Sequence, residues 1–246
     1  MKPSISFPSS IKEALQAVRE LYICIPRLIR LVRAASRSNT PTTAFREALV
    51  LAQSLYTSSG NPYIVEVLTA QTSYFADRSE YHPAKETGSS YSFSSLLVFV
   101  LATQYYAYRT LLCGLIQTLC MQEGTRCELD IEEVQREDVS AATSIAMCVS
   151  YVLQPARIHP TRARRLEVAL QISFGAWHRL GMRPKASSLD KVDQASYMKA
   201  WIVTTLGKLE NAFGGCSFDY HKIVTGCEFA AGGPRAAQMS TWIMSR

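Results

Sequence analysis

Tyr91 to Gln122 reads YSFSSLLVFVLATQYYAYRTLLCGLIQTLCMQ, an apolar segment whose only charged residue is Arg109. This segment decides the fold. Its large side chains recur at steps of three and four residues, which is the period of one helix face and not of a strand. The remaining faces are apolar as well. The segment therefore predicts one long helix that must be enclosed by protein or by lipid.

The choice between protein and lipid depends on length and on Arg109. A membrane-spanning helix needs about 20 predominantly apolar residues, and a central arginine costs roughly 2.5–3.5 kcal/mol on the insertion scale. Only about 13 residues between Tyr91 and Tyr108 are strongly hydrophobic, which is the length expected of a buried core helix. We therefore expect a core helix and no transmembrane span.

Composition places the chain among globular proteins. It has 246 residues, of which 48% are hydrophobic and 19% charged, enough for one large or two small domains. We expect a basic helical segment at 1–40, a helical domain at 41–215 and a loop-rich tail at 216–246. The seven cysteines are odd in number and include no C-x-x-C pair, which is typical of a reduced intracellular protein. The N-terminal residues do not have the pattern of a cleavable secretory signal.

The rest of the chain predicts further amphipathic helices around the central one. The first is expected to begin at Ser9 or Ser10 and to break or kink at Pro26. No segment shows strand alternation bounded by hairpin turns, and 77–90 is expected to be a loop. The fold class is therefore all-α, an irregular multi-helix bundle packed around a long central helix. The other helices are expected near 42–56, from Asn61-Pro62 to Phe75, across 131–153, from Thr161 to Gly181, and from Ser187 or Ser188 to Gly214.

Signatures of enzymes and metal sites are missing. The sequence has no nucleophile elbow, Gly-rich phosphate loop, dinucleotide fingerprint or H-E-x-x-H motif. An acidic cluster at 130–133 lacks the second acidic motif that a prenyl-binding enzyme would need. The spacing of the Cys and His residues at 216–227 does not match a structural zinc site. We therefore predict no catalytic residues, no metal and no cofactor.

One candidate ligand pocket lies on the central helix. Tyr105, Tyr106 and Arg109 share neighbouring turns, and Trp177 and His178 of a later helix are expected to pack nearby. An aromatic pocket with one buried cation suits a small anionic or aromatic ligand. The alternative is that this stripe is ordinary core packing.

A candidate interaction patch lies at the start of the helix that follows Pro160. Arg157, Arg162, Arg164 and Arg165 form the densest basic cluster in the sequence. The patch suits phosphate or an acidic partner, although a solvated first turn explains it as well. Arginines at a helix N-terminus oppose the helix dipole, so the cluster is unusual there. A second basic segment, Arg27 to Arg37, suits an anionic membrane, an acidic partner or a solvated face.

Four segments resemble a known family. They are PRLIRLVR, the YSFSSLLVFVLATQYYAYRTLLCGLIQTLC helix, SAATSIAMCVSYVLQP and LEVALQISFGAWHRLGM. Together they resemble the regulatory, or middle homology, region that follows the zinc-binuclear-cluster DNA-binding domain in fungal-specific transcription factors. The resemblance covers roughly Ser9 to Met182. It implies an all-helical, non-enzymatic domain of a nuclear regulator, often of metabolism or secondary metabolism, that acts through protein partners and sometimes a small-molecule effector.

The chain departs from that family at the DNA-binding module. The zinc cluster needs six cysteines in two close groups, whereas the N-terminal region has only Cys24. We therefore expect no direct sequence-specific nucleic-acid binding by this chain, which would be either a fragment or a stand-alone relative. The alternatives are an all-α small-molecule-binding protein or enzyme with its pocket on the central helix, which could be cytoplasmic, and a peripheral membrane protein.

Overall fold

The computed structural model describes residues 9–36, 43–76, 83, 88–121, 129–153, 160–183 and 189–213. Helices dominate this part of the chain, which confirms the predicted all-α class. Two short strands accompany them. The elements are α1 (Ser9–Ser36), α2 (Thr43–Ser59), α3 (Pro62–Gln71), β1 (Thr72–Phe75), β2 (Ser90–Phe93), α5 (Leu96–Cys120), α6 (Ile131–Met147), α7 (Val149–Leu153), α8 (Pro160–Met182) and α9 (Leu189–Phe213).

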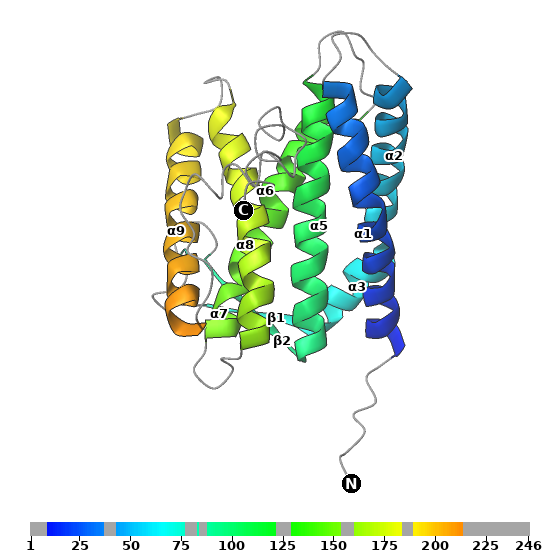
Figure 1. Cartoon of the computed structure of the whole chain (residues 1–246). Helices are drawn as coiled ribbons and strands as arrows, with labels where there is room; N and C mark the ends of the chain where they lie inside the picture. Colours follow the sequence, from blue (N-terminus) through cyan, green and yellow to red (C-terminus); the bar gives the residue numbers. More distant parts are fainter. Residues whose placement is uncertain are drawn as a thin grey trace, which may run out of the picture.

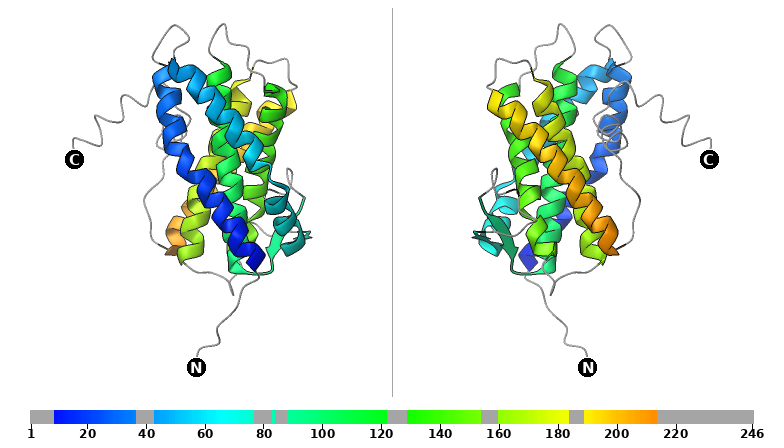
Figure 2. Two further views of the ribbon diagram at one scale, coloured as in Figure 1. Left: turned by 90° about the vertical axis from the view of Figure 1, so that its right-hand side faces the viewer. Right: turned by 90° about the vertical axis from the view of Figure 1, so that its left-hand side faces the viewer.

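Helix α5 lies in the centre of the molecule, as predicted. It packs against α1, α2, α6 and α8, and Figure 1 shows it between α1 and α8. Of the described helices, α5 is the one long and apolar enough to cross a bilayer, yet 72% of its most apolar window is buried inside the protein. The surrounding helices thus take the place that lipid would have. Figure 2 shows the α1–α2 pair on one side of the molecule and α9 on the other.

The N-terminal boundary of α5 corrects the expectation of an uninterrupted helix from Tyr91. The helix begins at Leu96, because Ser95 is its N-cap and accepts a hydrogen bond from the Val98 backbone N–H at 3.4 Å. The residues just before the cap form β2, which pairs antiparallel with β1 and places Tyr91 opposite Tyr74. The expectation of no strand was therefore wrong.

The β1–β2 hairpin was not predicted because its strands are only four residues long, and alternation over four residues is a weak signal. Tertiary packing determines that it forms. Tyr91 and Phe93 are buried, and the Phe93 ring lies 5.0 Å from the Tyr151 ring in an edge-to-face arrangement. The expected loop between the strands falls mostly outside the described residues.

Helix α1 does not break at Pro26, which excludes one of the two outcomes expected there, a break or a kink. It runs for 28 residues with Pro26 inside it, at an exposed position. Proline removes the hydrogen bond to the carbonyl of Tyr22 and costs a helix interior about 3 kcal/mol. Burial of Ile25, Leu28 and Val32 against the core on both sides of the proline offsets this cost.

Most of the remaining helix ends follow local sequence signals, but the helix expected to reach Phe75 ends at Gln71, because Thr72 to Phe75 pair with β2 as strand β1. Asn61 caps α3 by accepting from the Tyr63 N–H at 3.0 Å, and Pro62 occupies the first helical position, as predicted. Helix α8 ends at Met182, just before Pro184. The expected helix across 131–153 is divided at Cys148 into α6 and α7. A short helix expected at 235–244 lies outside the described residues.

Asp130 gives a direct test of these local signals. Its carboxylate accepts from the N–H groups of Glu132 and Glu133 at 2.9 and 3.3 Å, so the acidic cluster starts α6. We expect Asp130→Ala to lower the free energy of unfolding by about 1 kcal/mol, measured by urea denaturation. Asp130→Asn should retain most of the stability, because an amide oxygen also caps. Equal losses in both variants would contradict a capping role.

Candidate functional site

Three of the five residues predicted to form an aromatic pocket line one cavity. Tyr105, Tyr106 and Arg109 line a cavity of about 200 Å³ together with residues of α3, the hairpin and α6. The structure does not bring the other two predicted residues there. Trp177 is fully buried on α8, and the His178 ring stacks on Phe174 with centroids 6.5 Å apart.

The cation in this cavity is already paired. Arg109 is 5% exposed, and its guanidinium forms an ion pair with Glu137 of α6 and donates a hydrogen bond to the Ser59 hydroxyl. It also donates to the Tyr56 carbonyl at 3.3 Å and lies 4.8 Å from the centre of the Tyr56 ring. These contacts join α2, α5 and α6. Burial raises the pKa of the neighbouring Tyr105 hydroxyl, although Arg109 opposes that shift.

Removal of this cation tests its structural role. We expect Arg109→Met to lower the free energy of unfolding by about 2 kcal/mol, because the Ser59 hydroxyl and Glu137 lose their partner. Glu137→Gln should cost less, because the Glu137 side chain is 32% exposed and water can replace part of the ion pair. Chemical denaturation of both variants measures the difference. A larger loss for Glu137→Gln would contradict this order.

A second buried ion pair was not predicted from sequence. Asp138 of α6 is fully buried and accepts two hydrogen bonds of 2.8 Å from the Arg179 guanidinium of α8. Gln117 of α5 donates to the same carboxylate at 2.8 Å. Gly114 makes room for the pair, because a Cβ there would lie 2.7 Å from Arg179 Nη1. The Asp138 carboxylate therefore links α5, α6 and α8 through hydrogen bonds.

The acidic side chains of both charge clusters are in ion pairs. The carboxylates of Glu137 and Asp138 are each paired with an arginine. Burial raises the pKa of the Cys113 thiol to about 12 and that of Cys148 further, so both stay protonated at neutral pH. Within the described ranges, no group of three His, Cys, Asp or Glu side chains could hold a metal ion. The cysteines and histidine at 216–227 lie outside those ranges.

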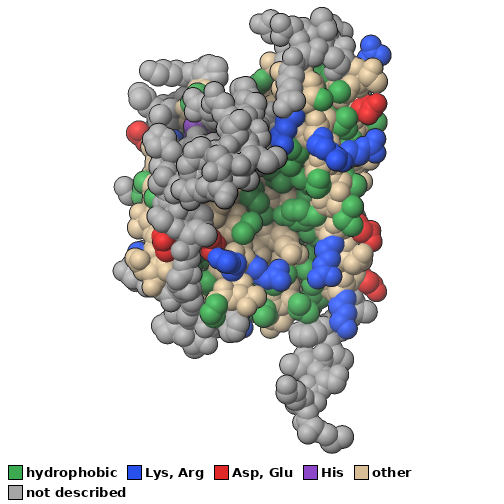
Figure 3. Space-filling view, viewed as in Figure 1, with side chains coloured by type: hydrophobic (Ala, Val, Ile, Leu, Met, Phe, Trp, Pro, Cys, Tyr) green, Lys and Arg blue, Asp and Glu red, His purple; other side chains and the backbone are tan. Residues whose placement is uncertain are grey.

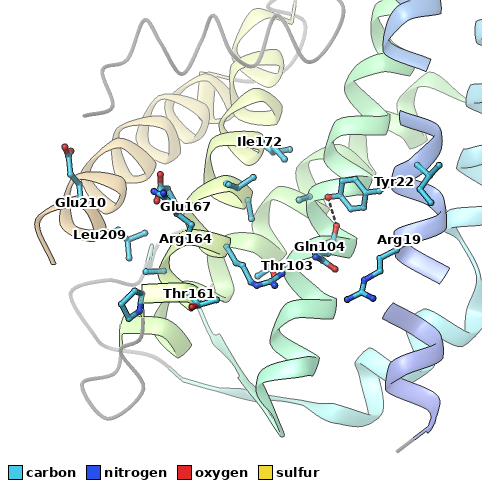
Figure 4. A pocket seen from close by; sticks show the side chains of 17 residues that line it. Arg19, Tyr22, Thr103, Gln104, Thr161, Arg164, Glu167, Ile172, Leu209 and Glu210 are labelled. Carbon is cyan, nitrogen blue, oxygen red and sulfur yellow. Dashed lines mark hydrogen bonds between the residues drawn. The ribbon is translucent and has the colours of Figure 1, made fainter. Parts of the chain in front are cut away.

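A groove of about 1030 Å³ lies between α1, α5, α8 and α9. We call it the α1/α8 groove. Thr103, Gln104 and Ala107 of α5 form its floor, and Figure 4 shows Tyr22 donating to the Gln104 carbonyl across it, at 3.0 Å. The walls comprise Arg19, Tyr22 and Ile23 of α1, residues 160, 161, 163–165, 167–169 and 172 of α8, and Leu209 and Glu210 of α9.

The lining of the α1/α8 groove is mainly apolar with a basic rim. Ile23 of α1 and Val168 of α8 both line it and are 73% and 53% exposed. Figure 3 shows hydrophobic side chains gathered in a hollow on this face, with Lys and Arg side chains on both sides. Such a surface resembles an interaction site more than a solvated face.

The predicted basic patch contributes to this groove. Arg164 and Arg165 line it, whereas Arg162 lies on the same helix outside the lining, half-buried. Arg157 falls outside the described residues. Arg19, on the opposite wall, was missed, because a single arginine on an amphipathic helix gives no signal of what lies across from it. The sequence signal that was available is the exposed apolar position Ile23 beside Arg19.

The comparisons with known proteins add no constraint. No family model matches the chain, and no curated protein or solved structure matches it.

Proposed function

We propose that the chain is a non-enzymatic regulatory and interaction domain of the fungal zinc-cluster transcription-factor type, acting in the nucleus through protein partners. The observation that carries the proposal is the α1/α8 groove. It exposes Ile23 and Val168 beside arginines along one groove. The helix order that resembles the family adds support.

The charges support a binding role over a catalytic one. In the described part of the chain, the buried acids are used to fasten helices, and the buried thiols are protonated at neutral pH. The exposed arginines of the groove flank a lining that is mainly apolar, whereas a nucleic-acid surface would gather basic and polar groups that reach phosphates and base edges. A protein surface suits this lining better.

The cavity at Tyr105 and Arg109 favours a second candidate function, the binding of a small molecule. Its volume of about 200 Å³ is below the roughly 300–1,000 Å³ of most ligand pockets. Its cation is also neutralised by Glu137. We therefore consider the α1/α8 groove the stronger candidate for the functional site.

A reporter assay tests the proposal. The full chain is fused to a heterologous DNA-binding domain and expressed in a fungal host with a reporter gene that carries the matching operator. We expect reporter output to change at least several-fold relative to the DNA-binding domain alone, and the untagged chain to enrich in the nucleus. Unchanged output together with exclusion from the nucleus would overturn the proposal. Reading the upstream genomic sequence for an in-frame cysteine cluster tests the family assignment separately.

A further inference from the structure

We propose that the α1/α8 groove binds an acidic amphipathic helix of a partner protein, laid along α5. The inference rests on the proposed function and names the chemistry of the partner. Its elements are an incompletely covered seam of α5, a basic wall on each side and apolar side chains placed where a docked helix would bury them.

The seam is visible in the burial pattern of α5. Leu97, Gln104, Leu111 and Thr118 are only partly buried, although most residues around them are fully buried. They are spaced by seven residues, so they form one continuous stripe, about 31 Å long, along the helix. This is the repeat by which one helix packs against another. Of the four residues in this stripe, Gln104 lies on the floor of the α1/α8 groove, where α1 and α8 flank α5.

The wall formed by α1 is basic along several turns. Arg19 and Ile23 line the groove, and Arg27 and Arg30 continue the same helix face at steps of four and three residues. All three arginines are exposed. The apolar face of α1, with Leu28 and Val32, is buried in the core, so this basic face is not the polar side of a membrane-inserted helix.

The α8 wall contributes Arg164 and Arg165, both exposed. Glu167 and Glu210 also line the groove, but Figure 4 places them toward α9, away from Arg19 and the α5 floor. A helix along α5 would therefore have arginines on both sides. Acidic residues that flank its apolar stripe would meet them, which is the helix-in-groove mode of recognition with charge complementarity.

A further observation favours a partner helix over the chain's own C-terminal segment. The chain's own C-terminal sequence, 214–246, has three basic and two acidic residues, and its charge does not complement the arginines.

The test measures binding of an 18-residue fluorescein-labelled peptide to the full chain by fluorescence anisotropy. The peptide carries Leu at positions i, i+4, i+7 and i+11 with Glu on both flanks, and a lactam bridge on its outer face holds it helical. We expect binding at micromolar concentrations that weakens at least five-fold between 50 and 300 mM salt. A peptide with the same composition and scrambled Leu positions should bind at least ten-fold more weakly.

Matched variants locate the binding site. We expect Arg19→Glu/Arg165→Glu to weaken binding at least ten-fold and to bind a Lys version of the peptide instead. Ile23→Asp should weaken binding to a similar degree. The controls are Arg46→Glu/Arg136→Glu and Val50→Asp, which change exposed residues of α2 and α6 away from the groove. Circular dichroism checks that each variant is folded.

The outcomes separate this inference from the proposed function. Absence of peptide binding up to 500 μM, or binding that the control variants weaken as much as the groove variants do, overturns the partner helix. Palmitate or phosphatidylserine vesicles that bind at the groove while the peptide does not would also overturn it, in favour of a small carboxylate or a membrane. Reporter output that persists in Arg19→Glu/Arg165→Glu would leave the regulatory function standing without this partner.

Discussion

Replacing Asp138 by asparagine should lower the free energy of unfolding by about 3–5 kcal/mol. The Asp138 carboxylate is fully buried and accepts hydrogen bonds from both Arg179 and Gln117. An amide in its place cannot neutralise the Arg179 guanidinium, whose side chain is only 17% exposed. The charge would remain in the interior without a counter-ion. Urea denaturation followed by circular dichroism measures the loss.

A second variant tests whether this loss of stability comes from the unpaired charge of Arg179. Asp138→Leu/Arg179→Met removes both charges, and we expect it to recover at least half of the stability lost by Asp138→Asn. Glu133→Gln on the same helix is a matched control at an exposed position and should be nearly neutral. If the double variant is no more stable than Asp138→Asn, the loss does not come from an unpaired charge.

Replacing Phe99 by alanine should also cost about 3–5 kcal/mol. Phe99 is fully buried near the start of α5, and its ring contacts Phe93 of β2 edge-to-face at 5.7 Å and stacks with Tyr151 of α7 at 5.4 Å. The substitution leaves a cavity where three elements meet. It should therefore destabilise the hairpin together with the helix, as measured by denaturation midpoint and by hydrogen exchange of the β2 amides.

Leu96→Ala is the matched control for this prediction. Leu96 is three residues earlier on the same helix but 40% exposed, so its truncation should cost less than about 1 kcal/mol. We expect the β2 amides to keep their protection in that variant. Similar losses for the two variants would show that helix propensity rather than the aromatic cluster determines stability here.

Helices and their ends were predictable because their determinants are local. The three-and-four spacing of apolar residues predicted α5, and Asn61-Pro62 and Gly181 with Pro184 predicted where helices begin and end. The β1–β2 hairpin was not predictable, because its strands are short and their pairing depends on Phe93 reaching Tyr151, 58 positions later. The sequence left open a break or a kink at Pro26, and core burial on both sides of the proline decided that α1 continues through it.

The candidate sites were predictable only in composition. The sequence alone indicated that Arg109 lies within aromatic residues, but its partners Tyr56 and Glu137 come from other helices. It likewise indicated that 162–165 is unusually basic, but not that Arg165 shares a groove with Arg19. Spacing along one helix determines which residues share a face, whereas the identity of the facing helix depends on packing.

By itself, the sequence determined that this chain is a helical protein organised around one apolar helix. The three-and-four spacing of apolar residues is enough for this, because residues three and four apart on a helix share a face whatever surrounds them. Only the tertiary structure decided that Asp138 meets Arg179, 41 positions away, and that Gln104 of α5 lies on the floor of a groove between α1 and α8. These pairings depend on the order and angles in which helices pack. Long-range burial sets that order, and no local segment encodes it.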